Sequence, residues 1–405
     1  MLYDLHELQR SLLAPFTAFT ETGSQLFSNP YSPLAYTPLS RQFAATYELA
    51  HRMGKDYEKP DWNLPVTTIN GRDVAVAEDI ALAQPFCRLV HFRRDVRRQD
   101  PRVLLVAPLS GHHATLLRDT VRALLPDHDI YVTDWIDARM VPAAEGTFGL
   151  DDYVHYIQTF LRHLGPDAHV MSVCQPTVPV LAAVSLLASA DDPCQPRSMI
   201  MMGGPIDTRK SPTQVNRLAT TKPYAWFEDN LIHRVPARYP GAGRLVYPGF
   251  LQHAGFVAMN PDRHLKSHYD FYLHLLRGDD NDAEAHRRFY DEYNAVLDMP
   301  ARFYLDTIRT VFQEFRLPMG TWTIDGALVE PAAIRKTALL TIEGELDDIS
   351  GSGQTHAAHH LCANLSPSMR EIHTAKDCGH YGIFSGRRWR SQICPKISAF
   401  IRAHA

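Results

Sequence analysis

The segment 169–179, HVMSVCQPTVP, constrains the fold more than any other part of the chain. The apolar run that ends at Val173 predicts a buried strand, and the Leu, Ala and Val residues between 180 and 188 predict a buried helix. The two prolines in between fit a first helical turn, where a missing N–H group costs nothing. Cys174 is therefore expected on a sharp turn from a strand into a helix.

A cysteine on such a turn has two interpretations. The free N–H groups and the helix dipole favour negative charge there, which favours a nucleophilic thiolate. A nucleophile elbow, however, normally has glycines two positions before and after the nucleophile, and here Ser172 and Pro176 occupy them. Taken alone, Cys174 fits an inert packing residue better, because free cysteines are among the most buried residue types. Which interpretation applies depends on whether residues later in the chain supply a base and an acid for Cys174.

Length and composition indicate which class of protein this is. The chain has 405 residues, more than one compact core usually holds, so a core domain with an insertion is expected. A hydrophobic content of 45% and a charged content of 21% are typical of a globular enzyme. The net charge is -4 with both signs dispersed, and the absence of a basic stripe argues against nucleic acid as a partner.

The N-terminus predicts a helix rather than a targeting segment. Acidic residues stand where a secretion signal would be basic and then apolar, and Leu5, Leu8, Leu12 and Leu13 share one helical face. No apolar run approaches the roughly 18 residues that a transmembrane segment needs.

The six cysteines show no C-x-x-C pair and no metal-ligand spacing, which fits a reducing compartment. We expect a cytoplasmic protein.

Strand and helix patterns alternate through most of the chain, which predicts a mainly parallel sheet covered by helices. The expected elements are a hairpin at 66–69 and 74–80, strands at 103–107, 130–133, 169–173, 199–202, 338–343 and 370–373, and helices at 115–125, 150–164, 180–188 and 389–402. We predict a helical arm over residues 1–60 and a core formed by 61–204 and 336–405.

Residues 205–335 interrupt this alternation and predict a helical cap. Between Tyr224 and Trp322, 18 of 99 residues are Phe, Tyr or Trp, against 10% for the whole chain. These aromatic side chains either form the core of the cap itself or offer an apolar surface to a substrate.

Two later strand ends supply partners for Cys174. The strand at 338–342 runs into a turn that contains Asp347, and the last strand runs into the segment Asp377–Gly382, which contains His380. Nucleophile, acid and histidine in this order suit a catalytic triad, in which the histidine is the base and the acid orients it. Asp348 is the alternative acid, whereas Glu343 and Glu345 are read as ordinary turn residues.

An oxyanion hole needs two N–H donors. We expect them from Gln175, which follows the nucleophile, and from Ser110, in the loop after the first parallel strand. The remaining histidines show no H-E-x-x-H pattern, and residues 278–282 lack the ligand spacing of a calcium loop. The sequence therefore predicts no metal site, and Cys378 is expected to be a packing residue.

Four segments carry a resemblance to a known family: 109–118, 172–176, 344–351 and 379–389. They are similar to the intracellular polyhydroxyalkanoate (polyhydroxybutyrate) depolymerases, and the first seven residues resemble that family too. The resemblance implies an α/β-hydrolase fold and a carboxylic ester hydrolase that degrades stored poly(3-hydroxybutyrate) at the granule surface in the bacterial cytoplasm. It also implies Cys174 as nucleophile, His380 as base and Asp347 as orienting acid, with no bound cofactor.

Several alternatives remain open at this point. Polyhydroxyalkanoate synthases also use a Cys-Asp-His triad, but usually in a G-x-C-x-G elbow, so Ser172 and Pro176 favour the depolymerases. A small-ester or thioester hydrolase and a granule-coat protein without turnover are the other candidates. Water or a thiol such as coenzyme A could accept the acyl group, and a homo-oligomer is compatible with the sequence.

Overall fold

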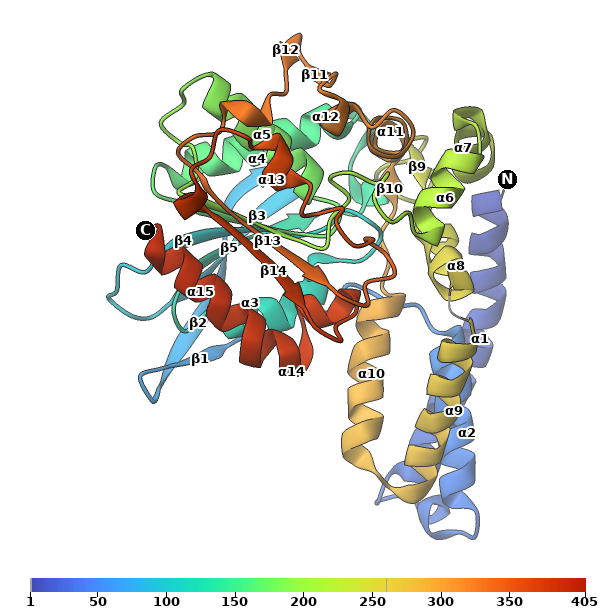
Figure 1. Cartoon of the computed structure of the whole chain (residues 1–405). Coiled ribbons are helices and arrows are strands. Elements are labelled where there is room, and N and C mark those ends of the chain that lie inside the picture. Colours follow the sequence, from blue (N-terminus) through green and yellow to red (C-terminus); the bar gives the residue numbers. More distant parts are fainter. Residues whose placement is uncertain (1, 260) are drawn as a thin grey trace.

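The computed structural model describes residues 2–259 and 261–405. Its centre is a nine-stranded sheet in the order β1-β2-β3-β5-β4-β6-β7-β13-β14 (Figure 1). In that order the strands span Val66–Ile69, Arg72–Gln84, Cys87–Arg94, Asp129–Trp135, Arg102–Val106, His169–Val173, Ser198–Met202, Ala338–Gly344 and Arg370–Ala375. From β5 to β14 neighbouring strands pair in parallel, whereas β1, β2 and β3 pair antiparallel.

The swap of β5 and β4, the antiparallel β3 and the strand-to-helix turn after β6 together give the α/β-hydrolase fold. Every residue of β6, β7 and β13 is buried, because helices cover both faces of a parallel sheet. The predicted hairpin and strands are confirmed. The sequence analysis did not assign β3, whose buried residues alternate with Arg88, His91 and Arg93.

Helices form a layer on each face of the sheet. Figure 1 shows α4 (Leu150–Leu164) and α5 (Thr177–Ser189) on one face, and α3 (Arg118–Leu124) and α15 (Cys394–Ala403) on the other. The helix predicted over 150–164 is confirmed at both ends. The helix predicted over 389–402 begins instead as a π-helix, Trp389–Ile393. Pro395 has no N–H group, so it cannot donate the α-helical hydrogen bond to the carbonyl four residues earlier.

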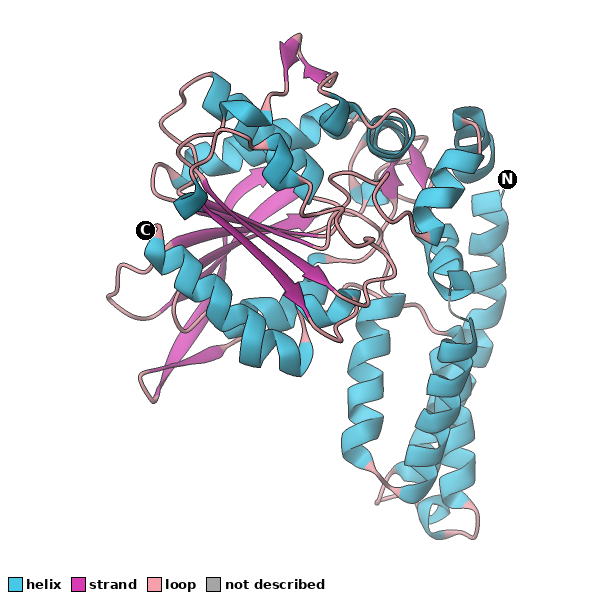
Figure 2. Ribbon diagram, viewed as in Figure 1, coloured by secondary structure: helices cyan, strands magenta, loops and turns pink. Residues whose placement is uncertain are grey.

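The segment between β7 and β13 is mostly helical and lies over the carboxyl ends of the strands (Figures 1 and 2). Its helices are α6 (Gln214–Thr221), α7 (Tyr224–Leu231), α8 (Gly249–Met259), α9 (Pro261–Arg277), α10 (Asp280–Asn294), α11 (Ala301–Thr307), a π-helix (Ile308–Gln313) and α12 (Arg316–Met319). Two small sheets that the sequence analysis did not predict join them: β8 (His233–Arg234), β9 (Leu245–Tyr247) and β10 (Met299–Pro300), and β11 (Thr323–Ile324) with β12 (Ala327–Leu328).

Many of the aromatic side chains in this segment pack inside it. Phe227, Phe271, Phe303 and Tyr290 are buried, whereas Tyr269 and Phe289 are exposed. The aromatic enrichment therefore serves mainly to build the core of the cap.

The chain begins with two long helices, α1 (Leu2–Ser28) and α2 (Ser40–Gly54), which pack against each other (Figure 1). The remaining short helices are α13 (Ala358–Leu361), α14 (Gly386–Arg388) and the 3₁₀ turns Pro33–Tyr36, Ala114–Leu117, Ala138–Met140, Ala143–Glu145, Pro331–Ala333, Pro367–Met369 and His380–Ile383. Among residues 2–259 and 261–405, no helix is both long and apolar enough to cross a membrane.

Candidate active site

Cys174 occupies the turn between β6 and α5, and its backbone is left-handed with φ of +67°. Such a conformation costs a non-glycine residue about 1–3 kcal/mol, so the surrounding contacts must hold it. The Cys174 amide donates to Met202 O at 2.7 Å, and the Cys174 carbonyl accepts from Thr177 Oγ1 at 3.0 Å. The turn is therefore fixed to the neighbouring strand on one side and to the helix on the other, which leaves the thiol half-buried at the sheet edge.

Gly204, the second residue after β7, makes room for this turn. A Cβ atom at Gly204 would lie 1.8 Å from Thr177 Oγ1 and 2.6 Å from Cys174 O. Close packing of the elbow thus depends on Gly204 in the neighbouring strand end. Two residues before the nucleophile, the buried hydroxyl of Ser172 donates to Ile200 O, so this position accommodates a serine in place of the usual glycine.

The acid and the histidine predicted from the sequence meet in the structure. His380 Nδ1 lies 2.8 Å from Asp347 Oδ2, and both side chains are almost fully buried. The other carboxylate oxygen of Asp347 accepts from the amides of Ile349 and Ser350, each at 2.9 Å. Asp347 therefore makes the contact with His380, while the alternative acid Asp348 is exposed.

The side chain of His380 also interacts with that of Cys174. Burial by itself would lower the pKa of His380, but the interaction with Cys174 and the hydrogen bond to Asp347 outweigh it. The pKa of His380 consequently lies well above its ordinary value. The imidazole of His380 thus has two partners in this series of three side chains: the carboxylate of Asp347, which it hydrogen-bonds, and the side chain of Cys174.

Gly203 forms the wall behind this series. A Cβ atom there would lie 3.2 Å from Asp347 Oδ2 and 3.3 Å from His380 Cε1, and the residue has φ of +54°. Gly203 directly follows the strand predicted at 199–202, and no role was predicted for it. Its position before a second glycine, after the strand that neighbours the nucleophile, is the signal that could have found it.

The predicted oxyanion donors lie after paired parallel strands, since Val106 of β4 is in register with Ser172 of β6. Among the described residues, neither the Ser110 amide nor the Gln175 amide donates to a protein acceptor.

The cap holds the loop that carries Ser110. The next residue, Gly111, has φ of +109° and accepts a 2.7 Å bond from Leu297 N. A Cβ atom at Gly111 would lie 2.7 Å from Gln252 Oε1 and 3.1 Å from the Phe256 ring, both on α8. Glycine is required here by conformation and by space, and the cap helix α8 fixes the position of the loop.

Tyr381 is a further residue of this site. Burial raises the pKa of its phenol above the usual range, and the charges of Tyr293 and Cys174 add to the effect. Tyr381 is thus a neutral phenol between the nucleophile and the cap. The sequence analysis quoted it within a motif but gave it no function.

Comparison with known proteins adds family membership to this geometry. The family described as PHB de-polymerase C-terminus matches residues 203–405, half of the chain. The chain belongs to this depolymerase family. Membership makes it an enzyme of the carboxylic ester hydrolase class, as the sequence analysis expected. No curated protein is similar to the chain in sequence.

Solved structures similar to this depolymerase family member are distant. A monoacylglycerol lipase of Paleococcus ferrophilus has a TM-score of 0.44 and 14% identity, over 76% of this chain and 96% of the lipase. A hydrolase of Pseudomonas aeruginosa has a TM-score of 0.46 and 14% identity, over 80% of this chain and 98% of its own. Because both scores are low, the fold assignment rests on the strand order and elbow of this chain.

Two more acids, Glu343 and Glu345, accept hydrogen bonds from backbone amides of loops near the site. Buried Glu343 accepts the amides of Gly353, Thr355 and His356 at 2.8 to 2.9 Å. Glu345 accepts the Asp377 amide at 2.7 Å, which ties the loop of Asp347 to the loop of His380. The prediction that Glu343 is an ordinary turn acid is therefore wrong.

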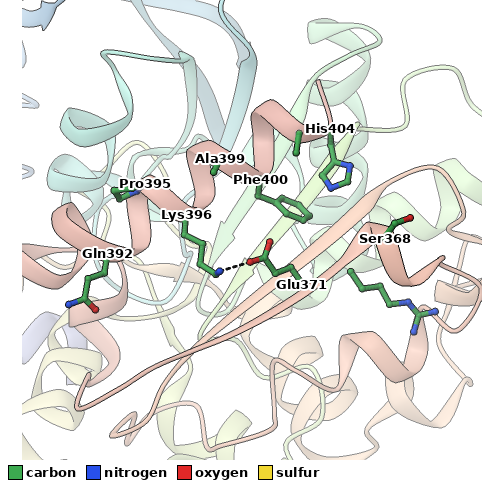
Figure 3. A pocket seen from close by; sticks show the side chains of 10 residues that line it. Ser368, Glu371, Gln392, Pro395, Lys396, Ala399, Phe400 and His404 are labelled. Carbon is green, nitrogen blue, oxygen red and sulfur yellow. Dashed lines mark ion pairs between the residues drawn. The ribbon is translucent and has the colours of Figure 1, made fainter.

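Metal-ligating side chains gather at one place outside the site. His274, Asp279 and Asp282, at the turn between α9 and α10, have ligand atoms within 4.8 Å of one another. His274 pairs with Asp279 at 3.3 Å, so these groups satisfy one another at the surface. A separate surface groove between β14 and α15, where Lys396 pairs with Glu371 (Figure 3), contains none of the predicted site residues.

Proposed function

We propose that this depolymerase family member cleaves the ester bonds of stored poly(3-hydroxybutyrate) with Cys174 as its nucleophile. The observation that carries the proposal is the buried His380–Asp347 pair beside a cysteine on a left-handed elbow. A base oriented by an acid, within hydrogen-bond reach of a nucleophile, is the arrangement that acyl transfer needs.

The environment of Cys174 differs from that of the buried cysteines. Burial raises the pKa of Cys362 to about 12 and the pKa of Cys394 to about 11, and it raises the pKa of Cys87 as well. These thiols are inert packing residues. Cys174 alone of the six raises the pKa of a buried histidine that itself contacts a carboxylate.

In the first half of the reaction, His380 accepts the thiol proton and the Cys174 thiolate attacks an ester carbonyl carbon of the polymer. The carbonyl oxygen becomes an oxyanion held by the Ser110 and Gln175 amides, each contributing roughly 3–4 kcal/mol to the transition state. The carbon–oxygen bond then breaks, and the alkoxide end of the chain leaves with the proton from His380. The enzyme keeps the acyl group as a thioester on Cys174.

In the second half, His380 takes a proton from water, whose oxygen attacks the thioester carbonyl. The carbon–sulfur bond breaks, a hydroxy acid or oligomer leaves, and His380 returns the proton to the thiolate. A thiol such as coenzyme A could take the place of water, because thioester exchange is chemically easy. The product would then be a 3-hydroxybutyryl thioester.

The substrate also sets the proposed location. Stored polyester forms granules inside bacterial cells, so we expect the enzyme in the cytoplasm at the granule surface.

The decisive experiment measures release of 3-hydroxybutyrate from amorphous poly(3-hydroxybutyrate) granules by the wild type and by Cys174→Ala. We expect the substitution to abolish release, whereas Cys194→Ala, a half-buried cysteine outside the site, retains it. Unchanged release by Cys174→Ala would overturn the mechanism. Adding coenzyme A and analysing the products separates thiolysis from hydrolysis.

The same preparation tests the rival functions. Polymer formed from 3-hydroxybutyryl-coenzyme A would indicate a synthase-like acyltransferase. Turnover of soluble p-nitrophenyl esters or acyl-coenzyme A, without activity on granules, would indicate a small-ester or thioester hydrolase. Granule binding without any turnover would indicate a coat protein.

A further inference from the structure

Helix α1 carries an apolar stripe on its outer side. Five large side chains recur at helical spacing along it and define what we call the α1 stripe: Leu5, Leu8, Leu12, Phe16 and Phe19. Each of the five is between 52% and 72% exposed. An amphipathic helix of a globular protein normally turns such a face toward the core. Here the face that the sequence groups together points to solvent.

The attachment of α1 to the protein does not use the stripe as a buried face. Of the residues 2–28 that form the helix, the buried ones are Tyr3, Glu7, Thr20 and Gly23. Tyr3 bonds Asp298, Glu7 pairs with Arg238, and Gly23 packs against the Tyr47 ring of α2. Scattered exposed apolar residues are normal, but a continuous row along one helix marks a binding surface.

The charged residues near the α1 stripe indicate what kind of partner it can bind. Between Ser11 and Ser40 the sequence holds one charged residue, Glu21, and no Lys or Arg. A helix that binds anionic lipid normally has basic residues beside its apolar face, and a coiled-coil helix normally has flanking charges that select its partner. Arg10, the one Lys or Arg of α1, pairs with Glu7 and Asp56. From Leu12 onward the stripe has neither kind of flanking charge, so its surroundings suit a partner that is apolar and uncharged.

We infer that the α1 stripe is the surface by which the enzyme docks on its water-insoluble, uncharged polyester. The inference rests on the proposed function, because it takes the substrate class from there. A polyester chain carries ester groups and methyl groups but no charge, and an exposed row of leucine and phenylalanine side chains gains free energy when such a surface covers it.

The docking helix is also tied to the catalytic loops. Tyr3 donates to Asp298 at 2.7 Å, and the same carboxylate accepts the Gly249 amide at the start of α8. The residue before Asp298, Leu297, donates to Gly111 of the oxyanion loop. A polymer surface bound by α1 is therefore held by an element that buried hydrogen bonds connect to the active site.

The test compares binding of three proteins to protein-free amorphous poly(3-hydroxybutyrate) granules by sedimentation. All carry Cys174→Ala so that the granules stay intact. The stripe variant adds Leu8→Gln, Leu12→Gln and Phe16→Gln, because glutamine keeps the helix propensity. The control variant adds Val66→Thr, Ile80→Thr and Ile372→Thr, three side chains on strands that are 50% to 57% exposed.

We expect the stripe variant to bind granules at least tenfold more weakly and the control variant to bind like the parent. With Cys174 restored, the stripe variant should hydrolyse a soluble 3-hydroxybutyrate dimer within twofold of the wild type. Equal granule binding by the parent and the stripe variant would overturn the inference and leave the proposed function intact. If the stripe variant lost dimer hydrolysis to the same extent as granule binding, the stripe would have a structural role, and this result would also overturn the inference.

Two further outcomes would assign the stripe to another partner and so overturn the inference. A parent that is a dimer by light scattering, with a monomeric stripe variant, would place a second copy on the stripe. Binding to phosphatidylglycerol vesicles as strong as to granules would make it a lipid-binding helix. Failure of the proposed function looks different: the wild type would then leave both granules and dimer uncleaved.

Discussion

Tyr3 donates a 2.7 Å hydrogen bond to the buried carboxylate of Asp298, 295 residues later in the chain. Asp298 lies beside a second buried carboxylate, because its amide donates to Asp137 Oδ1 at 3.3 Å. Arg139 pairs with Asp137 at 2.9 Å and is the cation of this cluster. The start of α1, the cap and the core therefore meet in one buried ionic network next to the oxyanion loop.

This network predicts a dependence of stability on pH. Burial first, and then the charge of Asp298, raise the pKa of Asp137 to about 7 from its ordinary 3.8. The folded protein thus binds a proton that the unfolded chain releases near pH 4, so this stabilisation is complete below that pH and is lost as the pH rises to about 7. We expect Asp137→Asn to reduce the loss of unfolding free energy between pH 5 and pH 8 by more than about 1 kcal/mol, measured by urea denaturation.

An exposed carboxylate serves as the control for this measurement. Asp348→Asn should leave the difference between pH 5 and pH 8 as it is in the wild type, since Asp348 is exposed. If Asp137→Asn and the wild type lose the same free energy over this interval, the titration of Asp137 is not responsible.

Gly203 predicts a defect in catalysis caused by a single methyl group. In Gly203→Ala the new Cβ atom would lie 2.7 Å from Ile383 Cδ1, which must move, and in tight contact with Asp347 Oδ2 at 3.2 Å and His380 Cε1 at 3.3 Å. We expect kcat/KM for a soluble ester to fall at least about tenfold, because small displacements of a catalytic base are costly. Gly243→Ala is the matched control, since Gly243 also has positive φ but no atom within 4 Å of the added Cβ. Equal activity of the two variants would contradict the prediction.

Asp347 and Asp348 predict opposite results for the same substitution. Asp347→Asn replaces the oxygen that accepts from His380 Nδ1 and leaves the imidazole without the carboxylate that orients it. By analogy with other triads, kcat should fall by about a thousandfold or more. Asp348→Asn should stay within twofold, and a larger effect there would assign the orienting role to the wrong neighbour. Initial rates on a soluble ester, with circular dichroism as a check of folding, decide between them.

The sequence predicted the features that depend on chain order. The strand before Cys174, the helix after it and the late turns of Asp347 and His380 have local signals, and parallel strands bring their carboxyl ends to one edge. Because of this arrangement, the sequence could predict that Asp347 and His380 lie near Cys174, although they follow it by 173 and 206 positions along the chain.

Features that depend on contacts across the fold escaped the sequence. The role of Gly203 exists only because Asp347 and His380 pack against it, and β3 is hidden because its charged residues face outward between apolar ones. Periodicity placed Leu5, Leu8 and Leu12 on one face of a helix, but it carries no information on whether the protein covers that face. Their exposure comes from the docking of α1 through Tyr3 and Glu7 instead.

The imidazole of His380 gives a direct measure of its contact with Cys174. The charge of Cys174 is the largest of the effects that raise the pKa of His380, against burial, which lowers it. Removing the thiol in Cys174→Ala should therefore lower the pKa of His380, and NMR titration of labelled histidine can follow it. Cys378→Ala is the control, because that buried thiol lies two residues from His380 in the chain but does not contribute to the shift. A pKa that stays high in Cys174→Ala would mean that Asp347 alone stabilises the imidazolium, and the thiol would then not be the partner of the base.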